Sequence, residues 1–275
     1  MTEERPIFDL REHFPRLAAS PAGRQLIGLF EGLLGFRRVR RLLRQLDDRC
    51  AEGEPPFDAF LSLMGFVPDA PGVVEAIPRE GAVVLVCNHP FGGADALVAS
   101  TLAMRAREDT RVMANAELSA INALKPSLII TEIMGRDGDE RRNISALRES
   151  LSHLRDGGAL VVFPAGAVAR WQPERGRVDE LPWSPHISRL ILKAKAPVLP
   201  VRFFGGNPAW FHLLGALHPL VRSALIPRVF LAQEGEEIPC RAGELLTPEK
   251  FPADAEKLTV LMRKKLEELV ECPGN

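Results

Sequence analysis

The feature that most constrains the fold is a series of short, wholly apolar runs that alternate with longer amphipathic stretches. The clearest run, residues 82–87, reads Ala-Val-Val-Leu-Val-Cys, and residues 159–163 form a second one. Because polar side chains do not alternate with apolar ones in either run, we expect strands that are buried on both faces. Such strands, separated by helices, predict an α/β sandwich with a largely parallel central sheet flanked by helices.

The same patterns predict the remaining elements. Further strands are expected at residues 111–114, 197–204 and 228–233, and helices at residues 95–107, 139–155, 184–196 and 252–270; residues 127–133 form a largely apolar run. In a parallel sheet the chemistry lies beyond the carboxyl ends of the strands. Two loops occupy such ends, residues 88–95 and 164–170, and we expect the functional residues there.

Composition narrows the functional classes. The formal net charge of the 275 residues is -1, which gives no reason to expect a nucleic-acid partner. The four cysteines lie far apart and form no C-x-x-C pair, so neither a disulfide framework nor a zinc site is expected, and a reducing compartment fits. No signal peptide is visible, and the longest apolar stretches fall short of the roughly 20 residues that span a bilayer.

Residues 24–46 differ in charge pattern from the rest of the chain. Gly35 is expected to separate two short helices, and the second has an apolar stripe with arginines mostly on its other faces: Arg37, Arg38, Arg40, Arg41 and Arg44. One interpretation is that this helix contacts an anionic membrane. The protein would then be cytoplasmic and peripherally associated with the inner face of the cell membrane. The other is that the stripe packs on the main domain while the arginines face water. We expect residues 1–60 to be this basic helical extension and residues 61–275 to be the main domain.

The loop at residues 88–95 carries a candidate base. His89 follows a buried strand, and Asp95 stands where the next helix begins. Gly92 and Gly93 supply the backbone freedom that lets the loop turn back on itself. If Asp95 accepts a hydrogen bond from one ring nitrogen of His89, the other nitrogen is left free as a base. The alternative is that Asp95 only caps its helix and His89 is a packed residue at the end of the strand.

Two motifs in this order resemble those of a known enzyme family. Asn88-His-Pro-Phe-Gly-Gly-Ala-Asp95, followed downstream by Phe163-Pro-Ala-Gly166, is similar to the signatures of the glycerolipid or lysophospholipid acyltransferase superfamily, which includes lysophosphatidate acyltransferases. The residues of these two motifs are closer to those of the branch called hemolysin-like, which is also similar to ornithine-lipid acyltransferases. The resemblance continues through residues 190–201, 204–207 and 217–222, and it covers about residues 60 to 245.

For residues 61–275, the resemblance implies a glycerol-phosphate acyltransferase-like sandwich. It also implies that this domain catalyses acyl transfer. His89 would remove the proton of a lipid acceptor as it attacks the thioester of an acyl carrier protein or coenzyme A, and Asp95 would orient His89. The thioester is a co-substrate, so no cofactor or metal is implied. The substrate-binding residues implied are those of the two loops and one arginine between them: Asn88, Phe91, Gly92, Gly93, Arg136, Phe163, Pro164, Gly166 and Arg170. The alternatives are a thioester or lipid hydrolase and a catalytically silent lipid-binding protein on the same fold.

The chain departs from the family pattern in the second signature. Ala165 stands where many members have a Glu that helps to hold the acceptor, and Ala167 stands where the hemolysin-like branch commonly has one. Between the two loops the family often supplies an arginine for the phosphate of the acceptor, and the resemblance makes Arg136 the nearest candidate, with Arg141, Arg142 and Asn143 as rivals. The apolar segment at residues 210–220 is expected to form an acyl-chain groove, a membrane-contacting element or part of the core.

Overall fold

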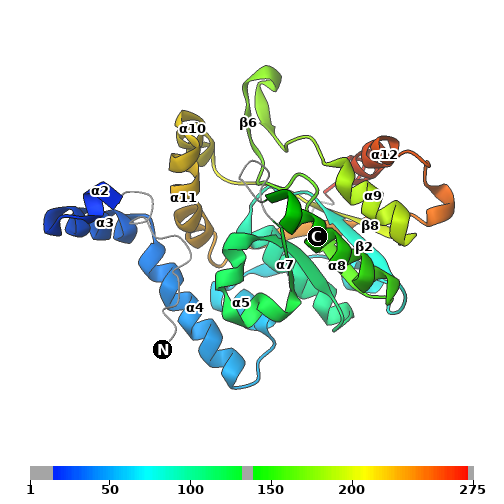
Figure 1. Ribbon diagram of the computed structural model, residues 1–275, viewed down its shortest axis with the longest axis horizontal. Helices are drawn as coiled ribbons and strands as arrows, with labels where there is room; N and C mark the ends of the chain where they lie inside the picture. The colour runs from blue at the N-terminus through cyan, green and yellow to red at the C-terminus, as the bar shows by residue number, and fades with distance from the viewer. Residues whose placement is uncertain (1–14, 132–138, 272–275) are drawn as a thin grey trace.

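The wholly apolar runs form the centre of a seven-stranded sheet in a computed structural model, which describes residues 15–131 and 139–271 (Figure 1). The strand order is β1-β9-β8-β2-β5-β3-β4, and only the pairing of β8 with β9 is antiparallel among the described strands of this sheet. The bounds are β1 (Val67–Asp69), β2 (Val83–Cys87), β3 (Arg111–Asn115), β4 (Leu128–Thr131), β5 (Ala159–Val162), β8 (Val198–Phe203) and β9 (Glu237–Ala242). The predicted α/β fold with a largely parallel sheet is confirmed.

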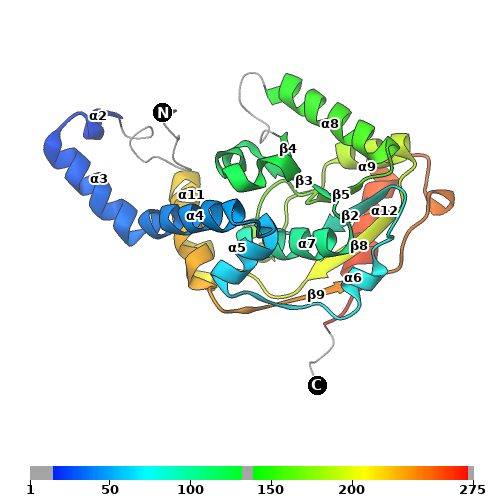
Figure 2. The same ribbon diagram turned by 90° about the horizontal axis from the view of Figure 1, so that it is seen from below.

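Helices cover both faces of the sheet because alternate side chains of its central strands point in opposite directions (Figure 2). In β2, Val83 and Leu85 pack with one set of helices and Val84 with the other. The first set is α5 (Pro56–Met64), α6 (Val73–Ala76) and α7 (Gly93–Ala106), joined by the 3₁₀ helices η1 (Ala116–Ala120) and η2 (Asn122–Ser127). The second set is α8 (Asp139–Arg155), α9 (Pro185–Ala194) and α12 (Ala255–Glu267). Outside the sheet lie the hairpin β6 (Arg170–Gln172) and β7 (Arg177–Asp179), and the 3₁₀ helices η3 (Pro173–Arg175) and η4 (Pro248–Lys250).

The N-terminal helices α2 (Pro15–Ala18), α3 (Pro21–Leu33) and α4 (Phe36–Ala51) extend to one side of the sheet domain (Figure 1). The predicted break at Gly35 is confirmed: its φ is 87°, and a Cβ there would lie 2.6 Å from Leu231. Leu42 and Leu46 are buried in the same core as α5 and α7, so the apolar stripe of α4 packs on the main domain. The domain boundary at residue 60 stays a prediction. Within the described ranges, no helix is long and apolar enough to cross a membrane.

The strand predicted at residues 228–233 is wrong, because this segment ends the helix α11 (Pro219–Ala232), which follows α10 (Ala209–Leu217). A short apolar run after a proline does not distinguish a strand from a buried helical turn. Packing decides: Leu225 and Val229, four residues apart, both pack with Phe211, as one helix face requires. On a neighbouring face, Phe230 makes edge contacts with Phe60 and Phe66.

Candidate active site

The carboxyl ends of β2, β5 and β8 meet at one edge of the sheet. These strands are parallel neighbours, so the segments that follow Cys87, Val162 and Phe203 lie side by side. The side chain of Asn88 joins two of them: its amide donates to the Phe203 carbonyl at 2.8 Å and accepts from the Phe203 N–H at 2.7 Å. Asn88 thus holds the end of β2 in register with β8, directly beside His89.

His89 and Asp95 meet across the predicted loop. Nδ1 of His89 lies 3.0 Å from Oδ1 of Asp95, whose side chain is wholly buried while that of His89 is 16% exposed. The geometry assigns the tautomer that carries its proton on Nδ1 and leaves the Nε2 lone pair free. A partly exposed imidazole in this state can remove a proton from a bound hydroxyl.

Asp95 is fixed by the start of α7. Its carboxylate accepts backbone N–H bonds from Phe91 (2.8 Å), Gly92 (3.2 Å) and Ala96 (2.7 Å), which satisfy donors that a helix start leaves without partners. The loop can close this tightly because Gly92 has a φ of 93°, and a Cβ there would lie 2.8 Å from the side chain of Val168. Asp95 therefore caps its helix and orients His89 with the same carboxylate.

The charges around His89 favour its protonated form. Burial lowers the pKa of His89, but the charge and hydrogen bond of Asp95, helped by Glu180, outweigh burial and raise this pKa above the ordinary value of imidazole. The charge of Arg222 acts in the opposite direction. At neutral pH a larger share of His89 is thus protonated than in a free imidazole, and the base form increases as the pH rises.

The second loop packs against the first. The ring of Phe163 lies 4.5 Å from that of His89, centroid to centroid, and the N–H of Ala169 donates to the His89 carbonyl at 2.9 Å. Gly166 turns the chain with a φ of 65°, and Ala165 is buried. The two loops therefore form one wall, and the small side chains at residues 165 and 167 leave space beside His89.

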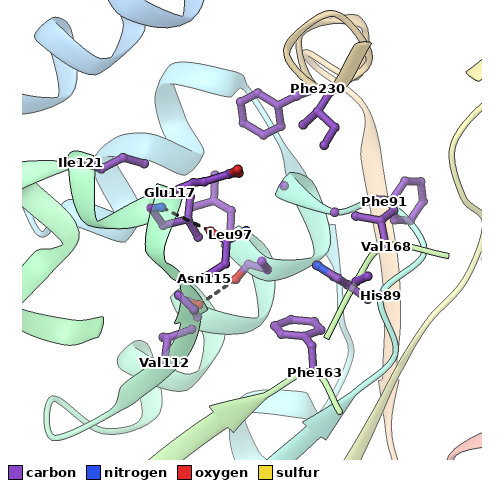
Figure 3. Close-up of a pocket in the computed structure, with 18 of the residues that line it drawn as sticks. His89, Phe91, Leu97, Val112, Asn115, Glu117, Ile121, Phe163, Val168 and Phe230 are labelled. Atoms are coloured by element: carbon purple, nitrogen blue, oxygen red, sulfur yellow. Dashed lines mark hydrogen bonds between the residues drawn. The ribbon is translucent and has the colours of Figure 1, made fainter. Parts of the chain in front are cut away.

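A cavity of about 660 Å³ opens in front of His89 (Figure 3). The ring of His89 is directed into this cavity, close to Phe163 and with Phe230 on the opposite side. The lining is mainly apolar and comes chiefly from α4, α5, α7, β3, η1, η2 and α11. It includes Phe36, Val39, Leu43, Phe57, Phe60, Leu97, Val112, Leu118, Ile121, Leu124 and Phe230. The cavity thus places a titratable base beside a mainly apolar interior.

Comparisons with known proteins agree with this arrangement. The family model described as Acyltransferase matches residues 73–203, a range that contains both loops. Over 142 residues, the chain is 27% identical to a lyso-glycine lipid O-acyltransferase of Bacteroides thetaiotaomicron. The matched segment covers 51% of this chain and 50% of the relative. A protein of the same name from Phocaeicola vulgatus is 25% identical over 142 residues, which cover 51% and 48%.

The chain thus spans about half the length of the curated relatives that it matches. Among solved structures, it is similar to the crystal structure of the 1-acyl-sn-glycerophosphate (LPA) acyltransferase PlsC from Thermotoga maritima. That likeness has a TM-score of 0.49 and 17% sequence identity, and covers 87% of this chain and 86% of that one.

The predicted substrate-binding residues fall into three groups. Those that line the cavity beside His89 are Phe91, Gly92, Gly93, Phe163 and Gly166. Asn88 and Pro164 instead hold the loops, through Phe203 and through the Ser184 N–H, which donates to the Pro164 carbonyl at 3.2 Å. Arg170 is exposed at the start of β6, and Arg136 lies outside the described residues.

The sequence pattern did not reveal a second carboxylate beside the base. Oε1 of Glu180 accepts the backbone N–H of His89 at 2.7 Å, and Oε2 accepts the Trp183 indole N–H at 3.0 Å. Burial raises the pKa of Glu180, although both hydrogen bonds oppose this shift. Because Glu180 is 91 residues from His89 in the chain, no local spacing connects them. Glu180 thus lies behind the loop and holds the backbone of His89 in place.

Asn207 is a second such residue. Its side-chain N–H₂ donates to the carbonyls of Pro90 (3.2 Å) and Phe91 (3.0 Å), and its Oδ1 accepts from Gln233 at 2.7 Å. The loop of the base is therefore tied, through a buried amide pair, to Gln233 directly after the end of α11. Asn207 could have been singled out from the sequence, because residues 204–207 belong to the stretch that resembles the family.

Proposed function

We propose that this chain transfers a fatty-acyl group from an acyl carrier protein or coenzyme A thioester to a lyso-phospholipid or lyso-aminolipid. The observation that supports this most is the Asp95-oriented imidazole of His89 in the wall of a mainly apolar cavity. The relatives named as lyso-glycine lipid O-acyltransferases support an acceptor that offers a hydroxyl.

In the proposed reaction, Nε2 of His89 takes the proton of the acceptor hydroxyl while its oxygen attacks the thioester carbonyl carbon. Asp95 stabilises the imidazolium through Nδ1. The tetrahedral intermediate then collapses, the carbon–sulfur bond breaks, and the imidazolium returns its proton to the departing thiolate. The products are an ester and a free thiol. No acyl-enzyme is formed in this scheme, and the buried thiol of Cys87, whose pKa is raised well above its ordinary value by burial, takes no part.

In this proposal, the apolar wall of the cavity retains the acyl chain. Each methylene that leaves water for an apolar wall contributes about 0.8 kcal/mol. The predicted groove at residues 210–220 contributes Phe211 to this wall, but most of the wall comes from the helices and strands between α4 and η2. We assign the cavity to an acyl chain, with the reacting carbonyl at His89.

The test is direct. Purified protein is incubated with labelled acyl carrier protein thioester, acyl-coenzyme A and a panel of lyso-lipids, and the lipids are identified by mass spectrometry. The expected product is a diacylated lipid that depends on the lyso-lipid supplied. Free fatty acid in its place would indicate a hydrolase, and lipid binding without turnover would indicate a silent lipid-binding protein.

We also propose that this activity takes place at a membrane surface, which α3 contacts. Four of its exposed side chains are apolar: Leu26, Leu29, Phe30 and Leu33 are between 43% and 60% exposed. The exposed Trp210, Leu213 and Leu214 of α10 add to this surface, since Leu34, Trp210 and Leu214 line one shallow depression. A large exposed apolar surface is typical of an interaction site.

The arginines of α4 contribute unequally to this surface. Arg37 donates to the Gly28 carbonyl at 2.8 Å, Arg38 pairs with Glu234, and Arg40 pairs with the buried Glu31 at 2.8 Å. Arg41 and Arg44 are exposed and have no recorded partner among the described residues. We therefore assign the contact with anionic lipid to these two arginines.

Replacing Leu29 and Leu33 by Ser is expected to weaken binding to acidic vesicles, on the order of 10-fold for each leucine, because apolar area no longer leaves water. Replacing Arg41 and Arg44 by Gln should cost roughly 1 kcal/mol each and reduce the sensitivity of binding to salt. Vesicle sedimentation measures both. Val260→Ser, which alters an equally exposed apolar residue on α12, is the matched control and should bind like the wild type. Unchanged sedimentation of the folded leucine variant would contradict the proposal.

A further inference from the structure

Glu180 follows the hairpin β6–β7 and reaches the proposed base from behind its loop. One carboxylate oxygen accepts the backbone N–H of His89 at 2.7 Å, and the other accepts the indole N–H of Trp183 at 3.0 Å. Both bonds favour the ionised form of Glu180, against the effect of burial. An ionised carboxylate is an acceptor only, which fits two N–H donors and no recorded acceptor. The geometry therefore fits a negative charge directly behind the base.

The chain at Glu180 is fixed by two other elements. The side chain of Gln172 in β6 donates to the carbonyls of Asp179 (3.1 Å) and Glu180 (2.6 Å). Oδ1 of Asp179 accepts the N–H of Glu180 at 2.8 Å and Nη2 of Arg263, a residue of α12, at 3.0 Å. Because β6 and α12 hold the backbone here, the Glu180 carboxylate can hold the loop of His89 in one position.

Three charged groups of the described residues act on His89. The carboxylates of Asp95 and Glu180 raise its pKa, and the guanidinium of Arg222, which two backbone carbonyls of the neighbouring loop hold in place, lowers it. While His89 is neutral, these groups leave one negative charge in excess. When His89 takes a proton, the charges balance, and balance is favoured because enclosed charges interact strongly. The second carboxylate therefore favours the state that follows proton removal from the acceptor.

We propose that Glu180 is a positioning residue for acyl transfer: it fixes the backbone of His89 and places a second negative charge behind the imidazolium that forms in the reaction. This inference rests on the proposed function, which makes His89 the base. Asp95 orients the ring through Nδ1, whereas Glu180 holds the main chain. Among the described residues, Leu181 and Pro182 line the cavity and Glu180 does not, so its carboxylate acts through His89 and not on a substrate.

Glu180→Gln is expected to lower kcat on the order of 10-fold, the effect of losing a hydrogen bond to a charged group, and to leave KM for acceptor and donor unchanged. The Gln oxygen can still accept the His89 N–H, but its NH₂ group then faces the indole N–H of Trp183. The inflection of kcat/KM should also move to lower pH, because one of the two charges that raise the pKa of His89 is gone. Steady-state kinetics measures kcat on the high-pH plateau, where His89 is neutral in both proteins.

A double variant separates the charge of Glu180 from its hydrogen bonds. In Glu180→Gln with Trp183→Phe, the amide oxygen can hold the His89 N–H without a conflict between two donors, so thermal unfolding should match that of Trp183→Phe alone. The inflection should still lie at lower pH than in Trp183→Phe, which keeps the charge. Glu174→Gln, which alters an exposed carboxylate of η3, is the matched control and should keep the wild-type kcat and inflection.

Two results would overturn the proposal: a wild-type inflection in either folded Gln variant, or a raised KM with unchanged kcat. If Glu180→Gln alone does not fold, the double variant provides the same test against Trp183→Phe.

A direct titration separates this proposal from the proposed function. The imidazole resonances of His89, identified by their absence from His89→Ala, report its pKa by NMR whether or not the protein transfers acyl groups. A lower pKa of His89 in Glu180→Gln than in the wild type, with no change in Glu174→Gln, supports the role of Glu180 even if no acylated lipid forms; the proposed function would then fail alone. Equal pKa values of His89 in all three proteins reject the role of Glu180.

Discussion

Replacing His89 by Ala is expected to lower acyl transfer about 10²- to 10⁴-fold, the range that a positioned general base contributes. An acceptor hydroxyl is a poor nucleophile until its proton is removed, and in the described structure the ring of His89 is the imidazole directed into the cavity. The loss should appear in kcat, because the lining that holds the acyl chain is unchanged. Steady-state kinetics with the best acceptor of the lyso-lipid panel measures it.

A second histidine provides the control variant for this experiment. His186 is exposed on α9, so His186→Ala should retain full activity. The His89→Ala protein should keep its circular dichroism spectrum and its binding of lyso-lipid, because the backbone bonds of His89 remain and Asp95 keeps its three backbone N–H donors. A folded His89→Ala protein with full acyl transfer would show that the base has been assigned to the wrong residue.

Asp95→Asn is expected to lower turnover by up to about 10⁴-fold, because an amide beside Nδ1 favours the tautomer that carries its proton on Nε2. The Asn oxygen can still accept the N–H bonds of Phe91 and Gly92, so the loop should be retained better than in Asp95→Ala. The double variant with His89→Ala should be little worse than either single one, since both residues serve one proton transfer. Additive losses would show that Asp95 acts elsewhere.

The pH profile gives an independent check on Asp95. His89 acts as a base only when neutral, so activity should fall as the pH drops through its pKa, which lies above the ordinary imidazole value. Asp95→Asn removes the charge that raises this pKa, and the inflection of kcat/KM should move to lower pH. The same raised pKa stabilises the fold below the pKa of an unfolded histidine, and this contribution is lost as the pH rises through the folded value. An inflection that does not move would contradict the pairing.

Much of the fold and the centre of the site followed from the sequence because they depend on local patterns. The apolar run at residues 82–87 predicted a strand buried on both faces, and the loop after it brought His89 and Asp95 within hydrogen-bonding distance over six positions. A histidine, a turn with two glycines and a carboxylate at a helix start need only short-range geometry. The break at Gly35 is of the same kind.

The tertiary structure decided what depends on segments distant in the chain. It showed residues 228–233 to be a helix, because packing against Phe211, Phe60 and Phe66 outweighs local propensity. It also placed Glu180 behind His89 and Arg222 behind Val168, across 91 and 54 positions, which no spacing rule spans. The cavity is built from helices and strands that meet only after the sheet has formed. Local patterns thus determined the reacting groups, while the sheet order determined which charges and walls surround them.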